Sequence, residues 1–245
     1  MTAFSRSGES EQLPATSLDH RLAEAARLLA AEPTEQETLD SAVRLAVSMI
    51  PGCTAAGVTL VGRRGELTTA AATDELVHEG DRIQYELGEG PCVDAVRDQE
   101  IVRSEDIATD TRWPRWSVAV VERLRVRSML CVQLYTTKGT HGALNLYALD
   151  THAFGGYAES LAATFGSVAS AALSSARTED QLQAAVQSRT LIGQAQGMIM
   201  ERYGLSDQNA FAVLSRISQD SNERLVEVAR TIVTTRQLPG ASEPV

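Results

Sequence analysis

The sequence predicts an α+β fold, in which an antiparallel sheet with packed helices is followed by a long helix that leads into an all-α module of three helices. Two pairs of strand-like segments with alternating apolar residues lie between helical segments in residues 18–176. Helical spacing then continues without a proline from Tyr157 to Tyr203, and two shorter amphipathic segments follow. A length of 245 residues also fits one large and one small domain better than a single domain.

Two helices are predicted before the first strand. Apolar residues recur at helical spacing from Leu18 to Leu29, and Pro33 interrupts the run. The second helix is expected to start after the N-cap Thr34 and to stop at Pro51. Residues 1–17 are rich in Ser, Glu, Pro and Gly, so we expect a disordered tail.

The sheet is predicted from two hairpins. The first joins residues 56–61 to 66–72, and the second joins 128–135 to 142–149. Between the hairpins we expect an irregular segment with local elements: a glycine turn at 88–90, a helix start near Pro91, a short strand at Ile101 and Val102, and a helix over Trp116–Leu124.

Residues 157–203 are expected to form one helix, or two with a break near 177–180. One helix would be about 70 Å long at about 1.5 Å per residue, which is too long for one globule. Its apolar stripe then needs a partner, so we predict a parallel homodimer with a helical linker or coiled coil at 177–187. Gly204 is expected to end the helix, and residues 237–245 are expected to form a flexible tail.

The C-terminal segments carry a family resemblance. SRTLIGQAQGMIM at 188–200, the Ala210-Phe211 pair, Leu214 and SQDSNERLVEVARTIV at 218–233 resemble the ANTAR module, which we place at 188–236. The resemblance implies an RNA-binding unit of three helices that recognises paired stem-loops in leader transcripts and stabilises an antiterminated form, usually as a dimer. Gln196 departs from the pattern, because relatives commonly carry a lysine there.

Candidate RNA contacts follow from that resemblance and from the side chains that hold phosphates and base edges. For each arginine the competing interpretation is a solvated surface residue, and for Gly193 and Gly197 it is close packing of helices. The net charge is −10, and residues 177–236 hold seven arginines and seven acidic residues, so binding depends on placement and not on bulk charge. The predicted RNA-binding residues are Arg189, Ala195, Gln196, Gly197, Met200, Arg216, Ser218, Asn222, Arg224 and Arg230.

Residues 20–176 resemble a GAF domain, and we place the domain at 18–176. The resemblance rests on LGEGPCVDAV at 87–96, DIATDTRWPRW at 106–116 and the strands of the second hairpin. It implies a sensory domain, and similar domains bind cyclic nucleotides, haem, another unidentified small molecule or no ligand; no cofactor is predicted. Candidate ligand-binding residues are Cys92, Trp113, Trp116 and Cys131. The competing interpretations are a packed Cys92 thiol and tryptophans that anchor the irregular segment by burial.

The predicted function is a signal-responsive RNA-binding regulator that acts by transcription antitermination and is not an enzyme. A DNA-binding regulator is the alternative, although its recognition helix would be unusually balanced in charge. A GAF-type methionine sulfoxide reductase is a weaker one, because Cys53 and Cys131 are not placed to assist Cys92, and a dimeric scaffold is a third. We expect a cytoplasmic protein without membrane contact, because no apolar run of roughly 18 residues or signal peptide is present.

Overall fold

A computed structural model describes residues 18–62, 64–97, 100–136 and 139–238. The predicted tail at 1–17 and most of the tail at 237–245 lie outside the described residues. The chain divides into two compact units, Met1–Arg177 and Thr178–Val245.

The N-terminal unit is built on a five-stranded antiparallel sheet in the order β2-β1-β5-β4-β3. Both predicted hairpins are confirmed, and the short strand β3 pairs with β4 at one edge. The strands are β1 Ala55–Val61, β2 Leu67–Ala72, β3 Ile101–Ser104, β4 Ser128–Thr136 and β5 Gly139–Ala148.

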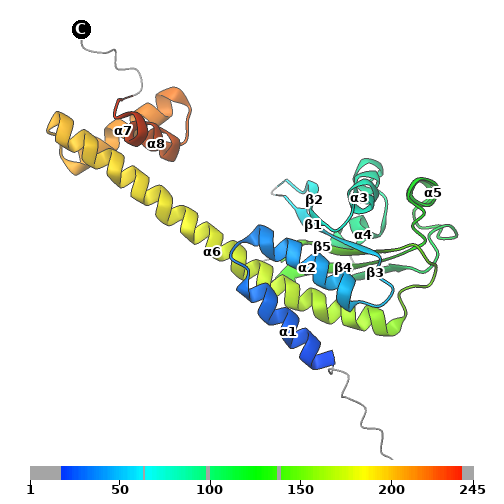
Figure 1. Cartoon of the computed structure of the whole chain (residues 1–245). Helices are drawn as coiled ribbons and strands as arrows, with labels where there is room; N and C mark the ends of the chain where they lie inside the picture. The colour runs from blue at the N-terminus through cyan, green and yellow to red at the C-terminus, as the bar shows by residue number, and fades with distance from the viewer. Residues whose placement is uncertain (1–17, 63, 98–99, 137–138, 239–245) are drawn as a thin grey trace, which may run out of the picture. The chain divides into compact units, whose positions relative to one another are not determined.

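Helices cover both faces of this sheet, as Figure 1 shows. On one face α1 (Leu18–Ala31), α2 (Glu35–Met49) and the start of α6 (Gly156–Tyr203) pack on an apolar core. On the other face lie α3 (Glu75–Leu87), α4 (Pro91–Arg97) and α5 (Pro114–Leu124). Because side chains alternate along a strand, Leu144 and Leu146 face the first layer and Tyr147 faces the second.

Helix α3 corrects the expectation of an irregular segment between β2 and residue 88. Asp74 caps its first turn by accepting a hydrogen bond from the Leu76 amide. Its buried face contains Gly80, Asp81 and Gln84 as well as apolar residues. Polar residues on the buried face interrupt the apolar period, which hides the helix from pattern analysis.

Helix α6 runs through residues 177–180 without the break that one of the two expectations allowed. Gly204, with a φ of 62°, follows the helix as predicted. Ser206 then caps α7 (Asp207–Ser221) through the Asn209 amide, and α8 (Leu225–Thr235) completes the C-terminal unit. None of the described helices has an apolar stretch that could cross a membrane.

Candidate functional site

The C-terminal unit is a bundle of three helices around a small apolar core. Alanine supplies a fully buried contact from each helix, with Ala195 on α6, Ala210 on α7 and Ala229 on α8. Small side chains at these positions let the helices approach closely. Ala195 is therefore corrected from an RNA contact to a core residue, because its side chain is 0% exposed.

The turn between α7 and α8 brings four of the predicted RNA-binding residues together. The Ser218 hydroxyl donates to the Glu223 carbonyl at 2.6 Å, and Asn222 ends α7 in the left-handed conformation with a φ of 55°. Arg224 lies immediately before α8, and Arg224 and Arg230 both pair with one carboxylate, that of Glu227, at 3.2 and 3.3 Å. Asn222, Arg224 and Arg230 are exposed to solvent, and Ser218 is partly buried.

The other predicted residues are dispersed over α6 and α7. The Gln196 amide donates to the Asp207 carbonyl at 2.9 Å and to its carboxylate at 2.6 Å, so this side chain holds α6 against the start of α7. Met200 is partly buried against the core, and Arg189 is exposed. Arg216 forms an ion pair with Asp220 of the same helix, with 3.8 Å between Arg216 Nε and Asp220 Oδ2.

Gly193 and Gly197 do not serve close packing of helices within the chain. A Cβ atom built at either glycine meets no other atom within 4 Å. The packing interpretation is therefore wrong for contacts within the described chain, and both glycines leave an open surface on α6.

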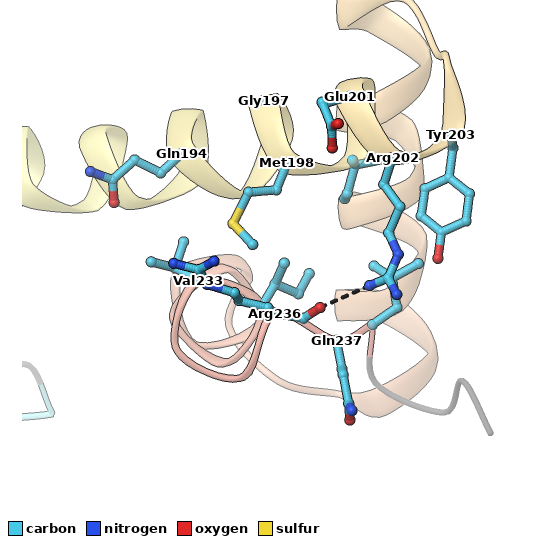
Figure 2. Close-up of a pocket in the computed structure, with 12 residues that line it drawn as sticks. Gln194, Gly197, Met198, Glu201, Arg202, Tyr203, Val233, Arg236 and Gln237 are labelled. Atoms are coloured by element: carbon cyan, nitrogen blue, oxygen red, sulfur yellow. Dashed lines mark hydrogen bonds between the residues drawn. The ribbon is translucent and has the colours of Figure 1, made fainter. Parts of the chain in front are cut away.

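Gly197 lines a cavity of about 870 Å³ between the last turns of α6 and α8 (Figure 2). Arg202, Tyr203 and Arg236 also line it, and the Arg202 guanidinium donates to the Arg236 carbonyl at 2.8 Å. Sequence reasoning did not select these three residues. A signal was present, since Arg202 and Arg236 have no acidic residue three or four positions away, whereas Arg216 and Arg224 do.

The N-terminal unit encloses a network of buried polar residues on the sheet face that α3 covers. Asp81 is 0% exposed, and its carboxylate accepts hydrogen bonds from Thr69 at 2.8 Å, from Asn145 at 3.0 Å and from the Tyr147 hydroxyl. Burial, opposed by these bonds, raises the pKa of Asp81 to about 6. Tyr85 continues the network through its hydroxyl to Thr69.

Cys92 belongs to the same network. Its thiol donates to the Thr59 hydroxyl at 3.2 Å, its backbone N–H donates to Gln84, and the Asn145 amide also donates to Thr59. Burial raises the pKa of the Cys92 thiol above its usual range, so the thiol stays protonated. Asn145 Oδ1 is buried and has no hydrogen-bond partner among the described residues.

The remaining predicted ligand contacts are also interior residues. Trp113 and Trp116 are at most 2% exposed and meet edge to face, with ring centroids 5.9 Å apart. The Trp113 indole donates to Asp94 at 2.8 Å, and Cys131 is fully buried in β4. The tryptophans thus anchor α5 to the core, and contact of any of these side chains with a ligand stays a prediction.

Family models match both units. Residues 32–174 match the GAF domain model, and residues 180–233 match the ANTAR domain model. A curated relative, the nitrate regulatory protein of Klebsiella oxytoca, is 33% identical over 57 residues, which are 23% of this chain and 14% of that protein. The match therefore covers a small part of the relative.

Solved structures resemble the fold. A GAF domain of the phosphoenolpyruvate-protein phosphotransferase from Coxiella burnetii aligns with a TM-score of 0.54 and 16% identity over 69% of this chain and 99% of that chain. The free methionine-R-sulfoxide reductase from Neisseria meningitidis aligns with a TM-score of 0.52 and 16% identity over 73% and 99%. At this identity the likeness establishes the fold alone.

Proposed function

This chain belongs to the GAF domain family and carries a C-terminal ANTAR domain, and from that premise we propose that it is a signal-responsive RNA-binding regulator of transcription. It acts by antitermination at stem-loops in leader transcripts. The observation that carries the proposal is the ANTAR match at 180–233, which coincides with a bundle whose core is apolar and whose arginines lie outside that core. The regulatory name of the Klebsiella oxytoca relative supports the same assignment.

The RNA interface is proposed around the turn between α7 and α8. Arg224 has a side chain that is 82% exposed, so its guanidinium can reach a phosphate without leaving the bundle. Its pairing with Glu227 does not prevent this, because an exposed ion pair contributes only about 0–1 kcal/mol. The interface would consist of Arg189, Gln196, Gly197, Met200, Arg216, Ser218, Asn222, Arg224 and Arg230.

A homodimer is proposed through α6. Leu182 and Val186 are one helical turn apart and are 65% and 56% exposed. Apolar side chains at that spacing on an uncovered helix are what a parallel partner helix buries. Two paired chains would present two three-helix bundles, one for each stem-loop of an RNA that carries two.

The GAF domain is proposed as the sensory part, and an enzymatic function is not proposed. The reductase resemblance is one of fold, and Cys92 and Cys131 are buried thiols whose pKa is raised by burial. A buried protonated thiol is a poor nucleophile. The DNA-binding alternative is disfavoured by composition, because Glu223 and Glu227 balance Arg224 and Arg230 in the third helical segment, which leaves no excess of basic residues for a recognition helix.

Sequencing of RNA that co-purifies with the intact protein tests this function. We expect transcripts with two adjacent hairpins beside a terminator to be enriched over total RNA. Duplex DNA at the same nucleotide concentration should not displace them. Efficient displacement by duplex DNA, or no enrichment by a protein whose helices are intact by circular dichroism, would overturn the assignment.

A further inference from the structure

The arginines of the C-terminal unit differ in their ion pairs. Three have an acidic partner on the same element or beside it: Arg216, Arg224 and Arg230. Within residues 178–238, Arg189, Arg202 and Arg236 have no such partner, and the last two, Arg202 and Arg236, line one cavity. These two residues therefore bring two positive charges, against one negative charge from Glu201, to one place in a chain that is acidic as a whole.

That place is the cavity between the last turns of α6 and α8. Its floor is apolar, because Ile199 and Ile232 are buried there at 2% and 3% exposure. Figure 2 shows the Arg202 side chain extending from α6 to the end of α8, with the Tyr203 ring beside it. Tyr203 is 48% exposed, which leaves much of its ring uncovered.

The residues that line this cavity indicate which type of ligand it would bind. An apolar floor and an uncovered aromatic ring accept a flat, partly apolar group, and the Arg202 guanidinium beside that ring accepts an anion next to it. Arg202 uses one N–H for the Arg236 carbonyl, and a guanidinium has five N–H groups, so donors remain. Glu201 is the acidic residue among those that line the cavity, and it would repel an anion from its own side.

We infer that this cavity binds one unstacked nucleotide of the RNA, with its base on the apolar floor and Tyr203 and its phosphate at Arg202, while Arg236 adds positive charge to the cavity lining. A volume of about 870 Å³ lies within the usual range for small-molecule sites of about 300–1,000 Å³. Single-stranded loops are where RNA offers splayed bases to aromatic and guanidinium groups. This inference rests on the proposed function and adds a site that lies beyond the turn between α7 and α8.

The test uses the full-length chain and a pool of RNAs that carry two hairpins with randomised loops. RNAs enriched on the wild-type protein are sequenced, and one of them is used to measure the affinity of variants. Tyr203→Ala should weaken binding roughly tenfold, since loss of a base stack costs about 1–3 kcal/mol. Tyr203→Phe, which keeps the ring, should bind within about twofold of wild type.

Matched controls remove the same groups elsewhere. Tyr157 is 59% exposed near the start of the same helix, so Tyr157→Ala removes a comparable ring away from the cavity. Arg123→Ala removes one exposed arginine of the N-terminal unit and is compared with Arg236→Ala at equal net charge. We expect both controls to bind like wild type and Arg236→Ala to lose affinity.

A second measurement does not depend on how the variants fold. The enriched RNA is prepared with 4-thiouridine in its loops, illuminated with the wild-type protein and digested for mass spectrometry. Crosslinks to residues 198–203 or 232–238 support the site. Crosslinks confined to the turn between α7 and α8, or unchanged affinity of Tyr203→Ala, would overturn it and leave the proposed function standing, whereas the absence of any enriched RNA would remove the proposed function itself.

Discussion

In the N-terminal unit, polar side chains between the sheet and α3 bond to one another away from solvent, whereas in the C-terminal unit the polar side chains surround an apolar core. The group around Asp81 includes Thr69, Asn145 and Tyr147, all joined by hydrogen bonds inside the protein. The buried residues of the bundle are apolar without exception among residues 178–238. A satisfied interior network fixes one arrangement of the sheet and α3, while solvated arginines remain available to a partner.

This contrast separates two kinds of sensitivity. Chemical changes within the N-terminal unit should act on its stability and on its response to pH, because each buried polar atom there depends on its neighbours. Changes on the surface of the bundle should act on RNA binding with little effect on folding. Both tryptophans, Trp113 and Trp116, lie in the N-terminal unit, so tryptophan fluorescence follows the unfolding of that unit alone.

The largest effect is expected from Gly142→Ala in β5. A Cβ atom at this position would lie 1.7 Å from the Thr59 carbonyl oxygen of β1, so the two paired strands would have to separate. We expect a loss of more than about 3 kcal/mol in the free energy of unfolding, measured by urea titration with tryptophan fluorescence. Gly155→Ala, where a Cβ meets no atom within 4 Å, is the control and should change this value by less than about 0.5 kcal/mol. A small effect of Gly142→Ala would show that β1 and β5 can move apart at Gly142 at little cost in stability.

The second prediction concerns pH. The pKa of Asp81 is about 6 in the folded protein, against about 3.9 for an exposed aspartate, so between these values the folded state holds more protons than the unfolded state. Stability from this group is therefore present below about pH 4 and is lost as the pH rises through about 6, by up to about 3 kcal/mol. Tyr85, Tyr147 and Cys92 face the carboxylate and remain neutral in this range, because the pKa of each is raised.

The variant Asp81→Asn tests whether ionisation of Asp81 lowers the stability of the folded protein. The amide keeps an oxygen for the Tyr147 and Asn145 donors but cannot ionise, so the variant should be more stable than wild type at pH 7.5 and should lose the advantage at pH 4.5. Urea titrations with tryptophan fluorescence at both values measure the difference, and Asp74→Asn, at the solvent-exposed N-cap of α3, is the control. A variant that is less stable than wild type at pH 7.5 would mean that the ionised carboxylate holds the network together.

These interior features were beyond sequence analysis for a physical reason. Proline and glycine stops, such as Pro33 and Gly204, and the apolar stripe of α8 predict helices because their signals are local. Asp81 and Gln84 look like surface residues until the fold surrounds them with donors, so neither α3 nor the network was predicted. Ala195 was placed in the RNA interface because a motif does not distinguish the buried face of a helix from its exposed face.

The third prediction concerns the outside of the bundle. Arg224→Ala should weaken binding of the enriched two-hairpin RNA by about fivefold, which corresponds to about 1 kcal/mol, and should lower the slope of log affinity against log salt by about one, since one phosphate contact is lost. Filter binding between 50 and 200 mM salt gives both quantities. Arg123→Ala, which removes an exposed and paired arginine of the N-terminal unit, should leave them unchanged. An unaltered slope for Arg224→Ala would remove this residue from the interface.

The smallest effect is expected from Gly193→Ala in α6, the counterpart of Gly142→Ala on an open surface. Because a Cβ at Gly193 meets nothing within 4 Å and alanine favours the helix, the variant should be more stable by about 0.5–1 kcal/mol. Thermal unfolding followed by circular dichroism at two protein concentrations measures the change. A loss of stability that grows at the higher concentration would place Gly193 against a second copy of α6, because a contact that no atom of the described chain makes has to come from a partner chain.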